Sequence, residues 1–393
     1  MQQMKIGFLS HLDLNLYLFR APLMRELRKR GHRVYAICPE GDKNDALRKL
    51  GVEVINYHVR RQSLNPLREI RTILEIREVL APLGLDLLHT FTAKPNIYGT
   101  LSAKAAGIPV ILNLVEGLGS LYIGNSLKNS VIRNIMEILY RQAFRFSNGC
   151  IFVNPDDAAY MVSKKIISAE KVRIIKGIGV DLDKFSMQRY PPEKQASIKK
   201  ALDVESKTVV LMVARAIWDK GIREFYEAAE TVKKAYPDAE FLLAGGLDAG
   251  NPSCAEESFL KSGSVRWLGH RDDVADILSI SDIYVLPSYR EGFPVTLMEA
   301  CAMEKPIITT NVTGCRETVE EGVNGFMVPA GDSHMLAQRI GLLIRDRNLR
   351  EKMGRKSREK AKREFDVNRI LQEYLDYYEK FIPVNGNGAR GEE

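Results

Sequence analysis

The sequence predicts an α/β protein built from two doubly wound, Rossmann-like domains that face each other across a cleft. Apolar, strand-like runs alternate with helix-like stretches, as in parallel sheets that are covered on both faces. The alternation stops once, in the polar segment 181–207, and then restarts. A chain of 393 residues is also long enough for two domains. In such folds a ligand binds at the carboxyl ends of the strands, and a two-domain version binds it in the cleft.

The order of the elements follows from the apolar runs. The first half begins with a strand at 5–10 and a helix that Gly31 ends. Its further strands are expected at 33–39, 52–57, 85–90, 109–115, 149–154 and 172–179, with helices near 66–81, 94–106 and 127–146. The second half has strands at 208–216, 240–246, 265–270, 282–288 and 306–311, and a helix at 221–236. We expect domains over 1–182 and 183–363, a last helix over 364–382 that returns to the first domain, and a flexible tail over 383–393.

Composition excludes several classes of protein. With 45% hydrophobic and 27% charged residues, the chain is neither disordered nor fibrous. The net charge of +7 favours anionic partners such as phosphates or acidic lipid, and is too small to indicate nucleic acid. The five cysteines form no C-x-x-C pair, which fits free thiols in a reducing cytosol. The sequence has no signal-like start and no run of about 18 apolar residues, so any membrane contact would be peripheral.

The sharpest motif is the loop 291–294, Glu-Gly-Phe-Pro, which directly follows the strand 282–288. Pro294 suits the first position of a helix, and the backbone N–H groups of that helix start suit a diphosphate. Glu299 comes eight residues after Glu291, where its carboxylate can accept hydrogen bonds from two neighbouring hydroxyls, as on a ribose. The alternative is a loop acid and a solvent-facing helix glutamate.

Two cations flank the first turn of the second half. Arg215 and Lys220 follow the strand 208–216, where they could neutralise the charge on a departing diphosphate. A lone arginine at such a position is usually structural, but a pair facing a helix N-terminus is less easily dismissed. The turn at 271–273 could offer backbone groups to a nucleotide base, or could be a helix N-cap.

These motifs carry a resemblance. The Glu-x7-Glu pattern, the Arg-x4-Lys-Gly of 215–221 and GIGVDLDKF at 177–185 resemble the family 4 retaining glycosyltransferases of GT-B fold, and 313–332 resembles that family's donor-domain ending. More specific strings resemble the branch that acts in bacterial protein N-glycosylation: LVEGLGSLYI (114–123), REFYEAA (223–229), GNPSCA (250–255) and LPSYREGFPV (286–295).

The resemblance implies transfer of N-acetylgalactosamine from UDP-GalNAc, with retention, to undecaprenyl-diphospho-N,N′-diacetylbacillosamine. The first domain would then take the acceptor and face the membrane, and the second would bind the nucleotide sugar. It further implies a peripheral enzyme on an anionic membrane surface, at the cytoplasmic face of the bacterial inner membrane, with no metal, no other cofactor and no nucleic acid. The alternatives are another UDP-HexNAc transferase of capsule or lipopolysaccharide assembly, a nucleotide-sugar epimerase, or a non-catalytic binding module.

The resemblance also assigns roles to residues. Glu299 would hold the donor ribose, Glu291 the donor sugar hydroxyls, and Arg215 with Lys220 the diphosphate. The implied donor-binding set is Arg215, Lys220, His270, Arg271, Glu291, Gly292, Phe293, Pro294, Val295, Thr296 and Glu299. In place of the histidine that relatives carry at a strand end, this chain has Glu116, beside two glycines. We expect Glu116, Glu291, Arg215 and Lys220 to be catalytic, with no protein nucleophile, and the alternative for Glu116 is a brace of its own loop.

The remaining candidates belong to the first half. Acceptor-side contacts are expected from Ser10, His11, Asn15, His89 and Lys94, although a lone histidine is more often packed or solvated. Ser10-His11-Leu12-Asp13 replaces the glycine pair of the family. Asp181-Leu-Asp183 has the form of a metal-binding D-x-D, but lies at the domain junction, so no metal is expected there. Basic residues gather in this half and could meet anionic lipid: Arg20, Arg25, Arg28, Lys29, Arg30, Arg33, Arg60, Arg61, Arg68 and Arg71. The stretch 127–146 is either part of that surface or, taken singly, a core-packing helix with a solvated basic face.

Overall fold

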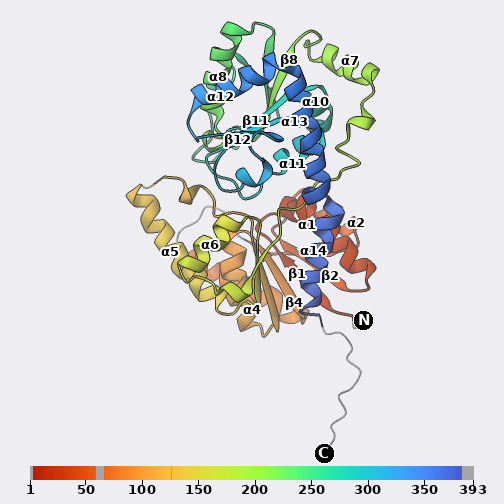
Figure 1. The fold of residues 1–393 in the computed structure, drawn as a ribbon. Coiled ribbons are helices and arrows are strands. Elements are labelled where there is room, and N and C mark those ends of the chain that lie inside the picture. The colour runs from red at the N-terminus through yellow and green to blue at the C-terminus, as the bar shows by residue number, and fades with distance from the viewer. Residues whose placement is uncertain (1–2, 59–65, 125, 383–393) are drawn as a thin grey trace, which may run out of the picture. The chain divides into compact units, whose positions relative to one another are not determined.

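The computed structural model describes residues 3–58, 66–124 and 126–382. The chain forms two compact units, each with its own sheet (Figure 1). Unit 1 comprises Met1–Ile178 and Ile370–Glu393, and unit 2 comprises Gly179–Arg369. The division falls at 178/179, compared with the 182/183 expected from the sequence. The expected tail, together with Arg60 and Arg61, lies outside the described residues.

The sheet of unit 1 is parallel and doubly wound. Among the described residues its strands have the order β3-β2-β1-β4-β5-β6-β7. Their bounds are β1 (Lys5–Leu9), β2 (Arg33–Cys38), β3 (Glu53–Asn56), β4 (Leu87–Phe91), β5 (Val110–Val115), β6 (Gly149–Phe152) and β7 (Val172–Ile174). The order reverses between β1 and β4, the switch point at which such sheets open for a ligand.

Helices cover both faces of this sheet. They are α1 (Asp13–Lys29), α2 (Asn44–Lys49), α3 (Pro66–Leu80), α4 (Thr100–Ala105), α5 (Leu127–Phe144) and α6 (Pro155–Ser163). A helix from the end of the chain, α14 (Val367–Glu379), joins them from Ile370 onward and buries Tyr374 and Tyr378 in unit 1.

Unit 2 repeats the plan. Its strand order is β10-β9-β8-β11-β12-β13, again within the described part of the chain. The strands are β8 (Thr208–Val213), β9 (Ala239–Ala244), β10 (Val265–Gly269), β11 (Ile283–Leu286), β12 (Ile307–Thr310) and β13 (Gly325–Val328). The helices are α7 (Pro192–Ala201), α8 (Ile222–Ala235), α9 (Glu257–Leu260), α10 (Val274–Ile280), α11 (Val295–Ala302), α12 (Ser333–Arg345) and α13 (Arg347–Lys360). The predicted fold class of two doubly wound α/β domains is therefore confirmed.

Several elements were not expected from the sequence, among them α7 and β13. The segment 181–207 contains α7, with Pro192 at its first position, where the missing N–H of proline costs nothing. The whole segment belongs to unit 2 and is not a simple linker between the two domains. The short strand β13 lies in a stretch for which no strand was expected.

The core of each unit lies on its inner strands, whose residues are mostly buried: β1, β2, β4, β5 and β6 in unit 1, and β8, β9, β11 and β12 in unit 2. All five cysteines are free thiols, as predicted. None of the helices in the described residues is long and apolar enough to cross a membrane.

Candidate active site

Lys220 and Glu291 meet at the carboxyl ends of β8 and β11. Lys220 Nζ donates to both carboxylate oxygens of Glu291, at 2.5 and 2.7 Å. The turn that carries Lys220 ends at Gly221, which has a φ of +77°. A Cβ there would lie 2.1 Å from the Pro287 carbonyl oxygen, so the close approach of the two loops requires glycine. The structure thus brings together two residues that lie 71 positions apart.

The loop of Glu291 is braced on a second side. Ser288 Oγ donates to Glu291 Oε1 at 2.6 Å, and the Glu291 backbone N–H donates to the Thr313 carbonyl at 3.0 Å. Gly314, with a φ of +82°, packs on the same loop, and a Cβ there would lie 2.5 Å from the Gly292 carbonyl oxygen. The Glu291 carboxylate is therefore a fixed group, held by a cation and a hydroxyl.

Arg215 pairs with a residue that the sequence analysis missed. Its Nη1 lies 2.5 Å from Asp248 Oδ2, and Asn251 Nδ2 donates to the same oxygen at 2.8 Å. Asp248 follows β9, in the glycine-rich stretch 245–250. Gly245 brings that loop against the β8 turn, since a Cβ there would lie 1.7 Å from the Ala214 carbonyl oxygen. Asp248 therefore orients the Arg215 guanidinium, which is itself more than half exposed.

Glu299 lies on the second turn of α11. Burial raises its pKa from 4.5 to about 7, with Lys184 partly opposing the shift. No hydrogen bond to the Glu299 carboxylate is found among the described residues, which leaves its oxygens available to hydroxyl donors. The helix begins at Val295, one position after the predicted start, and Pro294 occupies its N-cap position with an extended ψ of 116°.

Other members of the predicted donor set have different environments. Phe293 is buried and packs edge-on against Phe365, with ring centroids 5.7 Å apart, so its side chain belongs to the core. His270 is exposed beside Asp272, at 3.3 Å. Arg271 forms a two-pronged ion pair with Asp273, which lowers the pKa of that carboxyl.

The sequence analysis gave a helix N-cap as one alternative for the turn at 271–273, but no side chain of this turn caps the helix. Asp273 occupies the N-cap position of α10, but its side chain makes no capping hydrogen bond because Arg271 binds it. Val295 and Thr296 form the first turn of α11, so their backbone N–H groups lie at its N-terminus.

In unit 1, Glu116 lies directly after β5. Gly117 and Gly119 follow with φ values of +129° and +78°, conformations that favour glycine. Asn15 Nδ2 donates to both Glu116 oxygens, at 3.2 and 3.1 Å, and Arg20 donates to Oε1. Glu116 is therefore held by side chains of α1, in contrast to the brace through its own loop that was the alternative. Arg20 is only 2% exposed, so its expected place on a basic surface was wrong.

Most of the other side chains that were expected to contact the acceptor already bind side chains of unit 1. His89 lies within β4, is completely buried, and contacts the Tyr378 hydroxyl through Nδ1 at 2.5 Å. Burial, aided by the Arg20 charge, holds the pKa of His89 well below 6.5, so the imidazole is a neutral core group. His11 Nδ1 contacts Thr92 Oγ1, and Lys94 Nζ pairs with both oxygens of Glu69 at 2.9 Å.

Ser10 and Asp181 serve local structure. Ser10 is buried, its hydroxyl donates to Asn15 Oδ1 at 3.4 Å, and its carbonyl accepts from the Tyr57 hydroxyl. Asp181 Oδ1 accepts the backbone N–H groups of Asp183 and Lys184, at 3.0 and 2.8 Å. These bonds form a local turn that occupies one carboxylate oxygen of Asp181.

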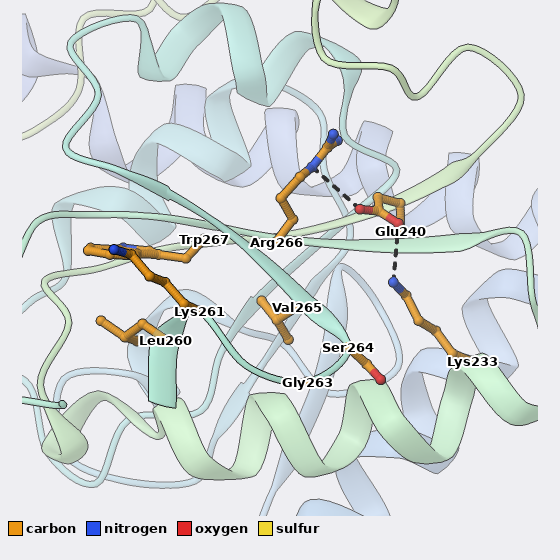
Figure 2. A pocket seen from close by; sticks show the side chains of 9 residues that line it. All are labelled: Lys233, Glu240, Leu260, Lys261, Gly263, Ser264, Val265, Arg266 and Trp267. Atoms are coloured by element: carbon orange, nitrogen blue, oxygen red, sulfur yellow. Dashed lines mark hydrogen bonds and ion pairs between the residues drawn. The ribbon is translucent and has the colours of Figure 1, made fainter. Parts of the chain in front are cut away.

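In the described part of the chain, the pockets include two that lie outside this set of residues. One, of about 1310 Å³, lies in unit 1 between α3 and the ends of β2 and β3. The other, of about 410 Å³, lies near the start of β10 in unit 2, away from the carboxyl ends of the strands (Figure 2). There Glu240 lies between Lys233 and Arg266, at 3.1 and 3.4 Å, so its charge is already matched.

Two family models match the chain. Residues 22–184 match Glycosyltransferase Family 4, and residues 193–360 match Glycosyl transferases group 1. Among curated proteins, the chain is 39% identical to N,N′-diacetylbacillosaminyl-diphospho-undecaprenol alpha-1,3-N-acetylgalactosaminyltransferase of Campylobacter jejuni, over 96% of this chain and 99% of that protein. It is 24% identical to UDP-Gal:alpha-D-GlcNAc-diphosphoundecaprenol alpha-1,3-galactosyltransferase of Escherichia coli, over 81% of each.

Solved structures show the same fold. Anabaena HepE in complex with UDP and glucose has a TM-score of 0.78 at 20% identity, covering 96% of this chain and 100% of that chain. Sucrose-phosphate synthase from Thermosynechococcus elongatus has a TM-score of 0.79 at 21% identity, covering 96% and 99%. Together with the two family models and the 39% identical relative, these matches show that the chain is a family 4 glycosyltransferase with the GT-B fold.

Proposed function

We propose that this glycosyltransferase moves N-acetylgalactosamine from UDP-GalNAc, with retention, to undecaprenyl-diphospho-N,N′-diacetylbacillosamine. The observation that carries the proposal is the group Arg215, Lys220, Glu291 and Glu299 at the carboxyl ends of the unit 2 strands. The choice of donor and acceptor is supported by the name of the C. jejuni relative, which is similar along almost its whole length.

The donor half of the proposal follows from charge and hydrogen-bonding capacity. Lys220 and Arg215 supply two cations, and the first turn of α11 supplies backbone N–H groups for the UDP diphosphate. The Glu299 carboxylate accepts no hydrogen bond from the part of the chain that the structure describes, so its oxygens suit the two ribose hydroxyls. Glu291, held by Lys220 and Ser288, presents its remaining acceptor sites to hydroxyls of the donor sugar.

The same residues support the chemical step. As the bond between the anomeric carbon and the diphosphate breaks, negative charge grows on the leaving oxygen, and Lys220 with Arg215 stabilises it. In the proposed front-face route, the leaving phosphate oxygen takes the proton of the attacking acceptor hydroxyl, so that no protein nucleophile is needed. Because two side-chain cations face the diphosphate, we propose that the reaction requires no metal ion or other cofactor.

The acceptor half of the proposal places unit 1 at an anionic membrane, on the cytoplasmic face. Helix α5, at the side of unit 1 (Figure 1), exposes Leu127, Val131, Ile135 and Ile138 to between 52% and 87%. Lys128 and Arg145 are exposed near its two ends, and the carboxylate of Glu137 is turned inward to the Tyr160 hydroxyl. The outer face is therefore apolar with basic ends, which differs from the solvated basic face expected as the alternative and suits the headgroup boundary of a bilayer.

A transfer assay with a panel of donors and acceptors tests the proposal. Purified protein is given labelled UDP-GalNAc, UDP-GlcNAc or UDP-glucose, with undecaprenyl diphosphate carrying either N,N′-diacetylbacillosamine or N-acetylglucosamine. We expect labelled lipid only from UDP-GalNAc and the bacillosamine lipid, and much less of it from the Lys220→Ala variant. Transfer from another UDP-HexNAc would favour the capsule or lipopolysaccharide alternative, and sugar conversion without acceptor would favour an epimerase.

A further inference from the structure

Arg20 is a buried cation with an unusual set of neighbours. It lies on α1 with 2% exposure, and its guanidinium donates to Glu116 Oε1. Its Cζ lies 4.7 Å from the centre of the Phe91 ring, and its charge opposes the rise that burial causes in the pKa of Tyr374 on α14. A buried arginine is costly unless its charge is paired, and Glu116 supplies that pairing.

We propose that Arg20, together with Asn15, is a positioning residue that orients the Glu116 carboxylate for sugar transfer. The inference rests on the proposed function, because it concerns how Glu116 meets the reacting sugar. It assigns Arg20 to the reaction through Glu116, without contact between Arg20 and substrate.

The contacts of the Glu116 carboxylate support the role of Arg20 and Asn15 in orienting it. Glu116 Oε1 accepts from Arg20 and Asn15, and Oε2 accepts from Asn15 alone. An ionised carboxylate has about four acceptor sites, so about one remains, on Oε2. The Glu116 side chain is 25% exposed, which keeps that site within reach of a ligand. Arg20 and Asn15 therefore fix the direction in which the last acceptor site points.

The pairing also changes the expected role of Glu116. An isolated carboxylate would stabilise a positively charged transition state through its field. With the Arg20 cation in contact, the two charges largely cancel at the distance of a bound sugar. Glu116 then acts as a hydrogen-bond acceptor of fixed geometry, for a hydroxyl or an amide N–H.

A double-mutant cycle separates positioning from packing. The variants are Arg20→Met, Glu116→Gln and the double substitution, with Arg48→Met as a matched control because Arg48 forms an exposed pair with Asp45. We measure kcat, the KM for UDP-GalNAc and the melting temperature. We expect Arg20→Met to lower kcat about 10- to 100-fold with little change in KM, the usual cost of losing a hydrogen bond to a charged group. In the Glu116→Gln background, the Arg20→Met substitution should alter kcat less than about twofold.

Two further variants keep the test decisive if Arg20→Met unfolds the protein. Asn15→Ala removes both Asn15 contacts to Glu116 and should lower kcat as Glu116→Gln does, while Arg20→Lys should restore part of the rate. Independent effects of Arg20→Met and Glu116→Gln on kcat, or a lower melting temperature with unchanged kcat, would overturn the inference. Absence of transfer by the wild-type enzyme would instead overturn the proposed function.

Discussion

Glu299 offers a prediction in which stability and function oppose each other. In the folded protein, burial raises its pKa from 4.5 to about 7. Each unit of pKa corresponds to 1.36 kcal/mol between the two protonation states, so the shift amounts to roughly 3 kcal/mol. The ionised carboxylate therefore destabilises the fold without ligand, and the Glu299→Gln variant should be the more stable protein at pH 8.

The pH dependence of unfolding gives the sign of the stability difference between the wild type and the Glu299→Gln variant. Below about pH 4.5 the group is protonated in both the folded and the unfolded chain, so the two proteins should have equal stability. As the pH rises from 4.5 to 7, the unfolded chain loses its proton first, and the wild type loses stability relative to the variant. Above pH 7 the difference should stay constant.

Thermal unfolding between pH 5 and pH 9 measures this difference, with UDP titration at pH 8 as the functional readout. Glu227→Gln, at an exposed position of α8, is the control for the loss of one negative charge. We expect Glu299→Gln to unfold several degrees higher at pH 8 and to bind UDP about tenfold more weakly, since it loses charged hydrogen bonds to the ribose. A variant less stable than the wild type at pH 8, or one with unchanged UDP affinity, would refute the reasoning.

Three further predictions concern the donor site, the metal and the membrane. Lys220→Ala should weaken UDP binding about 10- to 150-fold in calorimetry, whereas Lys261→Ala, which removes an exposed partner of Glu257, should not; equal affinities would contradict the assignment. Activity should survive excess EDTA, and loss that Mn²⁺ or Mg²⁺ restores would contradict a metal-independent reaction. Ile135→Asp on α5 should reduce sedimentation with anionic vesicles, and salt should release the wild type, whereas equal binding to neutral vesicles would contradict the charge argument.

The fold was predictable because buried parallel strands leave continuous apolar runs, which the sequence shows directly. One of the helices that the sequence analysis missed, α7, buries none of its residues. Its stability comes from good helix-forming residues and Pro192 at its start, so no apolar periodicity marks it. The strand β13 has four residues and begins with glycine, which gives little strand signal.

The placement of candidate site residues was predictable where they lie on short segments after strands, as Lys220, Glu291 and Glu299 do. It was not predictable where a long-range partner decides the role. Asp248 meets Arg215 from 33 positions away, and Arg20 meets Glu116 from 96 positions away. An arginine on a helix gives no local sign that it will be buried, which is why Arg20 was expected on a basic surface.

The reaction product tests the central claim of the account most directly. Wild-type enzyme is incubated with UDP-GalNAc and undecaprenyl-diphospho-N,N′-diacetylbacillosamine, and the lipid product is analysed by mass spectrometry and by proton NMR of its new glycosidic bond. We predict that the lipid gains one N-acetylhexosamine in α linkage, the configuration of the donor. A β-linked product, a lipid that gains a different sugar, or an unchanged lipid would contradict the account.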